Sequence, residues 1–182
     1  MKKIGFLFLL ILAPFVKAQT LDSQEVEFRV TLPEVALVSL KPENTTIILE
    51  MGVTQKAGEK IEYISKSDSQ LWLNYTCSIA PDSPSKNISA QISSETVPEG
   101  LVLQLKVSEY TGTGKGQFGT SIPKINLQNF PQIILSNIGG SYTNQGSYNG
   151  HKLEYNLEVT NYKLLDSEKS NTLTIVYTLS DN

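Results

Sequence analysis

Hydrophobic and polar residues alternate with a period of two along most of this chain. The clearest runs are LWLNYTCSI (71–79), LVLQLKV (101–107), HKLEYNLEV (151–159) and TLTIVYTL (172–179). Successive side chains of a β-strand point to opposite faces, so each run predicts a strand with one face toward a core and one toward water. The same reasoning predicts shorter or weaker strands at EVEFRVTL (25–32), VALVSL (35–40), TIILEM (46–51), KIEYIS (60–65), NISAQI (87–92) and QIILSNI (132–138).

Turn-forming residues separate these runs. Pro98-Glu99-Gly100 and Asn149-Gly150 are typical examples, and no convincing run at helical spacing lies between them. Roughly ten short strands with regular turns in one chain of this length predict an all-β fold, a single antiparallel β-sandwich of the Ig-like or Greek-key type. A closed barrel is the alternative.

The first residues have the pattern of a secretory signal peptide. A basic start at Lys2 and Lys3 is followed by a short apolar run, and small residues precede an expected cleavage between Ala18 and Gln19. A retained N-terminal anchor is the alternative, and no later segment is long enough and apolar enough to span a bilayer. The expected organisation is a signal peptide at 1–18 and one sandwich domain at 19–182, exported to the periplasm, the cell surface or the medium.

The charge of the chain argues against polyanionic partners. The formal net charge is −3, and removing residues 1–18 makes the chain more acidic because this segment contains three lysines and no carboxylate. Arg29 is the only arginine, and no basic cluster is present. Binding to nucleic acid is therefore not expected.

Cys77 and His151 are each the only residue of their type. A single thiol cannot form an internal disulfide, and alternation places Cys77 among buried apolar residues. His151 directly follows the Asn149-Gly150 turn, so we expect it at the solvent-facing start of a strand. One histidine and scattered carboxylates do not form a recognisable catalytic or metal-binding pattern, so no enzymatic activity, metal or cofactor is predicted.

The stretch TGTGKGQFGT (111–120) matches the Gly-x-Gly-x-x-Gly pattern at Gly114, Gly116 and Gly119. A dinucleotide site needs this turn to open a helix, whose N-terminus then faces the pyrophosphate. Here Pro123 and β-branched neighbours follow, which argues against a helix. We interpret this stretch as a bent loop in which the glycines adopt backbone conformations with positive φ.

The stretch GGSYTNQGSYNG (139–150) combines Tyr142 and Tyr148 with small and amide side chains, a composition suited to surface recognition. One hypothesis is that the two tyrosines stack on a sugar or a partner, and the alternative is a plain mobile connection. Trp72 is predicted to pack in the core, or else to offer an exposed aromatic platform.

In its size, its signal peptide, its acidic strand-rich body and its terminal strand with Tyr177, the chain resembles secreted pilin-type sandwiches, either chaperone–usher fimbrial subunits or spore-coat-like proteins. Unlike many fimbrial subunits, it lacks a cysteine pair. The resemblance implies a non-enzymatic structural or adhesive surface subunit whose N-terminal residues add a strand to a neighbour. The candidate assembly strand carries Val26, Phe28, Val30 and Leu32, and an ordinary first strand is the alternative. The implied partners are a second copy or a periplasmic chaperone, and a glycan would be the partner if the chain is instead a carbohydrate-binding module.

Overall fold

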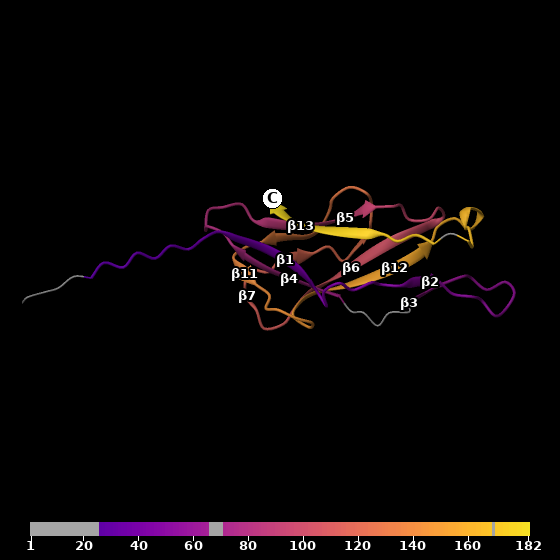
Figure 1. Ribbon diagram of the computed structural model, residues 1–182, viewed down its shortest axis with the longest axis horizontal. Helices are drawn as coiled ribbons and strands as arrows, with labels where there is room; N and C mark the ends of the chain where they lie inside the picture. Colours follow the sequence, from indigo (N-terminus) through magenta and orange to yellow (C-terminus); the bar gives the residue numbers. More distant parts are fainter. Residues whose placement is uncertain (1–25, 66–70, 169) are drawn as a thin grey trace, which may run out of the picture. The chain divides into compact units, whose positions relative to one another are not determined.

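The computed structural model describes residues 26–65, 71–168 and 170–182 (Figure 1). The predicted signal peptide and its cleavage site at Ala18 and Gln19 lie outside these residues. The chain divides into two units, one ending at Leu32 and one that spans Pro33–Asn182.

The second unit contains two main antiparallel sheets. The larger one consists of β1 (Val35–Lys41), β4 (Leu71–Ser78), β6 (Leu101–Thr111), β7 (Lys115–Gly116), β9 (Lys124–Asn126), β11 (Ser141–Tyr142) and β12 (Gly150–Val159). The smaller one consists of β5 (Lys86–Ser94), β8 (Thr120–Ser121), β10 (Gln132–Ile138) and β13 (Thr174–Asp181). A separate hairpin pairs β2 (Leu49–Met51) with β3 (Tyr63–Ser65), and a short 3-10 helix spans Tyr162–Leu164.

Strand β4 lies in the middle of the larger sheet. One of its edges pairs with β1 over the full length of that strand, from Val35 opposite Ser78 to Lys41 opposite Trp72. Its other edge is shared by β11 and β12, and β12 continues into a long ladder with β6. In the smaller sheet the order is β13-β5-β10-β8. Consequently β1 and β13 each have a strand neighbour on one side only within the described residues.

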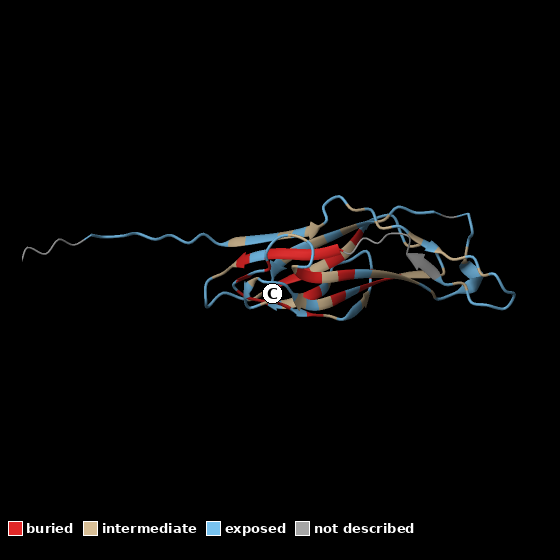
Figure 2. Cartoon of the chain, turned by 90° about the horizontal axis from the view of Figure 1, so that it is seen from below, coloured by how far each residue is buried: buried red, intermediate tan, exposed pale blue. Residues whose placement is uncertain are grey.

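The two sheets pack face to face around an apolar core, as Figure 2 shows by the buried residues along the central strands. Along most strands the inward-facing side chains alternate with outward-facing ones, as the period of two predicted, whereas Ile134 and Leu135 of the irregular strand β10 are both fully buried. The fully buried members come mainly from β4, β5, β6 and β10, and include Leu73, Ile88, Leu105 and Ile134. The prediction of an all-β sandwich is therefore confirmed.

The strand expected at 25–32 is not formed in the described part of this stretch. Residues 26–34 have no regular secondary structure, and the side chains of 26–32 are exposed. The period of two is present, but a sequence pattern does not say whether a partner strand is available in the fold. The described residues of the predicted strand therefore form an exposed segment with alternating apolar side chains.

Candidate functional site

The residues of the candidate assembly strand, 26–32, are here called the N-terminal segment. Its four apolar side chains are between 71 % and 85 % exposed, which is unusual for residues of this kind arranged in regular alternation. They are Val26, Phe28, Val30 and Leu32. An alternating apolar segment without a partner has the pattern of a strand that is completed by another chain.

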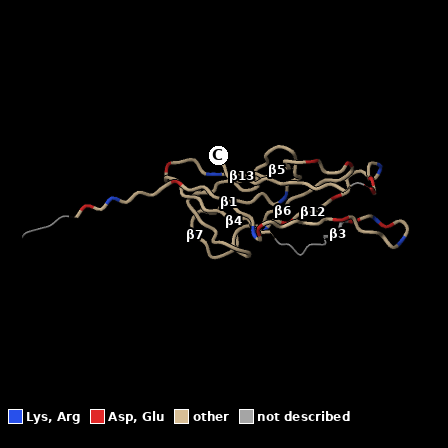
Figure 3. Tube along the Cα trace, in the orientation of Figure 1, with Lys and Arg blue, Asp and Glu red and all other residues tan. Residues whose placement is uncertain are grey.

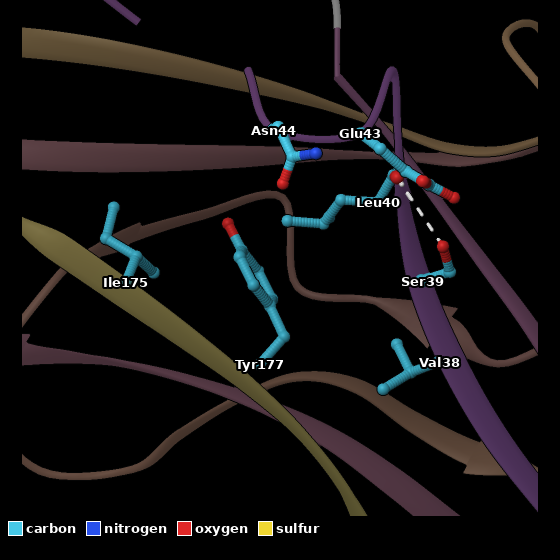
Figure 4. Close-up of a pocket in the computed structure, with 7 residues that line it drawn as sticks. All are labelled: Val38, Ser39, Leu40, Glu43, Asn44, Ile175 and Tyr177. Atoms are coloured by element: carbon cyan, nitrogen blue, oxygen red, sulfur yellow. Dashed lines mark hydrogen bonds between the residues drawn. The ribbon is translucent and has the colours of Figure 1, made fainter. Parts of the chain in front are cut away.

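A groove of about 390 Å³ opens between the edge strands β1 and β13, and it is called the edge groove below. Val38 and Leu40 come from β1, and Ile175 and Tyr177 come from β13 (Figure 4). These four side chains pack against the core but are only half-buried, whereas their counterparts on the central strands are fully covered. The apolar core is therefore only partly covered where the two sheets meet at this edge.

Polar groups mark one end of the edge groove. Glu43 and Asn44, in the turn after β1, line this end, and Ser39 of β1 completes the lining of the groove. The Glu43 carboxylate pairs with Lys41, and the hydrogen bond from this ammonium group holds the pKa of the carboxyl below its usual range.

A buried lysine links the two edge strands at the opposite end. The Lys86 ammonium lies 2.8 Å from the Glu34 carboxylate, just before β1, and 2.7 Å from Asp181, at the end of β13. Hydrogen bonds to Asp181 and then to Glu34 raise the pKa of Lys86. Because the start of β1 is tied to the end of β13, the two strands run in opposite directions along the groove.

Tyrosines join the sheets beneath the groove. The Tyr177 hydroxyl is hydrogen-bonded to the Tyr155 hydroxyl, which comes from β12 in the other sheet. Burial raises the pKa of Tyr155 to about 12 and that of Tyr177 well above its ordinary value, so both remain neutral. One side of Tyr177 therefore contributes to the core and the other lines the groove (Figure 4).

The second candidate site is the loop at 139–150. Tyr142 lies on β11, and Tyr148 lies in the following turn with a positive φ of 69°. Both are exposed, as a recognition surface requires. The Tyr148 ring lies 5.4 Å from the ring of Trp72, measured between centroids.

Trp72 is buried, as expected, but not in the core between the sheets. It lies on the opposite face of β4 from Leu71 and Leu73, beneath Tyr148. Within the described residues its indole Nε1 and the Oδ1 atom of Asn74, two positions along the same face, are buried without a hydrogen-bond partner. Unmatched buried donors and acceptors are uncommon in proteins, and both of these atoms lie below the surface of this face.

His151 is fully buried, which corrects the expectation of a solvent-facing position. It lies at the start of β12, between β4 and β6 and opposite Leu73 of β4, on the same inward side as Leu153. Its Nδ1 lies 2.8 Å from the carbonyl oxygen of Ser108, so Nδ1 carries the proton, and Nε2 accepts from the Tyr75 hydroxyl at 3.2 Å. Burial lowers the pKa of His151, so the ring is held neutral as a structural bridge. His151 lies two residues before Leu153 on the same strand, so the two side chains share a face, and this was the sequence signal for an inward position.

The three glycines of the 111–120 stretch lie where strands approach closely. Gly116 is in β7 with a φ of +114°, and a Cβ there would collide with the backbone of Gly140 and Ser141. A Cβ at Gly114 would meet the backbone of Tyr142 and Thr143, and one at Gly119 would lie 2.7 Å from Ile138. The stretch is followed by β8 rather than by a helix.

Charged side chains are spread along the strands and turns (Figure 3). Within the described ranges, no group of three or more His, Cys, Asp or Glu residues is placed to hold a metal ion. The described residues also include no helix with the length and apolar character needed to cross a bilayer. Comparison with models of known protein families, with curated proteins and with solved structures finds no match for this chain.

Proposed function

We propose that this chain is an exported, non-enzymatic subunit of a surface polymer, structural or adhesive in role. In this assembly the N-terminal segment of one copy fills the edge groove of the next. The observation that supports this most directly is that one chain carries both an exposed, alternating apolar segment and a half-covered groove between two strands that, within the described residues, each pair on one side only. A periplasmic chaperone would protect the groove before assembly.

The segment matches the neighbouring strand β1 in length and the edge groove in apolar character. Seven residues at about 3.3 Å each span roughly 23 Å, the length of the seven-residue strand β1 that borders the groove. A strand in this position would pair its backbone with the free edge of β1 or β13 and direct its four apolar side chains at the core. Burying each of these side chains contributes about 1.5–3 kcal/mol before the cost of association.

The test compares assembly of the chain beginning at Gln19 with that of three variants. One lacks residues 19–32, one combines Phe28→Asp with Val30→Asp, and the control combines Glu27→Gln with Arg29→Gln on the polar face of the same segment. Light scattering and electron microscopy over a range of concentrations should show polymers for the unaltered chain and the control. The deletion and the aspartate variant should require at least tenfold higher concentration.

A result that contradicts the proposal is equally clear. The proposal is wrong if the unaltered chain and the deletion variant both remain monomers and a synthetic peptide of residues 26–32 does not bind to the deletion variant. Assembly of the aspartate variant at the same concentration as the control would also exclude groove filling by the segment.

A carbohydrate-binding module is the second candidate. The observation that favours it is the exposed Tyr148 ring, which lies over the buried Trp72 ring. Sugars combine apolar ring faces with hydroxyls that both donate and accept, so they suit such a surface. Glycan binding by the monomer should change Trp72 fluorescence and disappear with Tyr148→Ala, while Tyr162→Ala, an exposed tyrosine elsewhere, leaves it unchanged. Binding that survives Tyr148→Ala and Tyr142→Ala together would exclude this surface.

A further inference from the structure

We infer that the junction Pro33-Glu34-Val35 prevents the N-terminal segment from folding back into the edge groove of its own chain, so that a second copy is the partner that fills it. This inference rests on the proposed function. The segment ends at Leu32 and β1, which borders the groove, begins at Val35. The segment is therefore close enough in sequence to fold back onto β1 of its own chain. Without an obstacle, a hairpin would satisfy each chain alone and no polymer would form.

The faces of the two stretches limit the possible hairpins. On β1, Val38 and Leu40 point into the groove, and the apolar residues of the segment are also even-numbered. Directly opposed residues of an antiparallel pair share a face, so the loop between them must contain an odd number of residues. A two-residue loop at 33–34 would turn the apolar side chains away from the groove, and it would also require a positive φ at Pro33, which the proline ring excludes.

Three-residue loops have the correct parity, and three of them are possible at this junction. Such a loop has two residues in right-handed conformations followed by one with positive φ. The loop 31–33 places Pro33 at the positive-φ position, which it cannot adopt. The loop 32–34 places Pro33 second in the turn, where it forces the preceding residue out of the required conformation. The loop 33–35 places Val35 at the positive-φ position, which a β-branched residue strongly disfavours.

A five-residue loop takes its residues either from β1 or from the N-terminal segment. A loop at 30–34 would leave Val30 and Leu32 in the turn, where they could not enter the groove. A five-residue loop at 33–37 would take three residues from β1, and each of them is paired with β4 in the register that runs from Ser78 to Thr76. The ion pair between Lys86 and Glu34 also fixes the middle residue of the junction. The sequence at this junction therefore favours a chain that continues away from β1 over one that reverses onto it.

The loop 33–35 needs only one substitution to become favourable. Val35→Gly supplies a residue that accepts positive φ, and Pro33 is then well suited to the first position. The resulting hairpin would place Leu32 opposite Ala36 and Val30 opposite Val38, with the apolar side chains directed into the groove. Val35→Ala is the matched control, because it also removes the valine side chain but keeps a residue that disfavours positive φ.

Arg29 provides a direct readout, because it is the only arginine of the chain and lies in the middle of the segment. An arginine-specific protease therefore reports whether residues 26–32 are free or paired. With the chain beginning at Gln19 and kept dilute enough to be monomeric, we expect fast cleavage of the unaltered chain and of Val35→Ala. We expect cleavage of Val35→Gly to be at least tenfold slower, and this variant to remain monomeric at concentrations where the control polymerises.

A second variant tests the inference independently in case Val35→Gly fails to fold. The double substitution Pro33→Asn and Glu34→Gly opens the loop 32–34 without changing β1, and it should also give protected monomers. The inference is overturned if both variants polymerise and are cleaved like the unaltered chain, or if the unaltered monomer is already protected at Arg29. In both of these cases strand addition itself survives. If a peptide of residues 26–32 fails to bind to the chain lacking residues 19–32, the proposed function fails and the inference falls with it.

Discussion

At the scale of single residues, the buried histidine links the core to solution pH. The backbone N–H of Gly119 donates to the Tyr75 hydroxyl, which donates to Nε2 of His151, whose Nδ1–H donates to the Ser108 carbonyl. Burial also raises the pKa of Tyr75 to about 12, so the hydroxyl keeps its proton. Protonation of the ring would add a proton at Nε2. The Tyr75 hydroxyl donates to this atom in the neutral form, so this hydrogen bond would be lost. The folded state therefore disfavours the imidazolium form.

This arrangement predicts a loss of stability in mild acid. The pKa of His151 is lowered in the folded chain, so above about pH 6.5, the ordinary value, both states are neutral and stability is complete. As the pH falls below 6.5 the unfolded chain binds the proton first, and the free energy of unfolding decreases by up to about 1.4 kcal/mol per pH unit until the folded pKa is passed. Urea unfolding between pH 7.5 and 5.5 should show this slope.

The control for this prediction separates titration from packing. His151→Asn keeps a donor for the Ser108 carbonyl but does not titrate, so its stability should be nearly flat over the same pH range. Tyr75→Phe loses a hydrogen bond but keeps the imidazole, so the pH dependence should persist. Parallel slopes for the unaltered chain and His151→Asn would exclude the histidine as the cause.

Sequence alternation identified which residues face the core better than it identified what covers the other face. Cys77 was predicted to be buried, and it is. His151 shares the parity of Leu153, but the adjacent Asn149-Gly150 turn suggested an exposed position instead. Trp72 has the parity of an outward residue, and it is buried because a loop about seventy residues later covers it. Such long-range cover has no local signal in the sequence.

At the scale of elements, the long strands could be predicted and the two-residue strands could not. The strands β4, β5, β6, β12 and β13 are long enough to show several cycles of alternation. The two-residue strands β7, β8 and β11 are too short for any period, and they are held by pairing with distant segments. The N-terminal segment shows the reverse case, because it has the pattern of a strand but pairs with no other strand among the described residues. Its pattern carries the proposed function for this reason.

The β7–β11 pair gives a prediction for the glycine stretch. Gly116 combines positive φ with backbone contacts that leave no room for a Cβ, so Gly116→Ala should destabilise the fold by about 2 kcal/mol or more. Gly140 lies beside it, but a Cβ there meets no atom within 4 Å. Gly140→Ala should therefore change the free energy of unfolding by less than about 0.5 kcal/mol. Equal urea midpoints for the two variants would show that the close approach at Gly116 does not constrain the pair.

At the scale of the whole molecule, the sandwich holds its sheets together without covalent links. Cys77 is the only thiol and lies 3 % exposed in the core on β4. Burial raises its pKa, which reduces the reactive thiolate further. A thiol reagent can therefore reach Cys77 only when the sandwich opens, either globally or locally at the β1 edge, and its reaction rate reports how often this happens.

This property connects stability to the edge groove. In native buffer, labelling of Cys77 in the chain lacking residues 19–32 should be slow and should accelerate with urea in step with global unfolding. If a peptide of residues 26–32 binds only the closed sandwich, it should slow labelling by a factor of one plus the ratio of peptide concentration to its dissociation constant. A peptide with Phe28→Asp and Val30→Asp should have no effect. Labelling that is fast in buffer and insensitive to urea would instead mean that the β1 edge opens locally, and the groove would then be a flexible margin of the sheet rather than a fixed receptor for a strand.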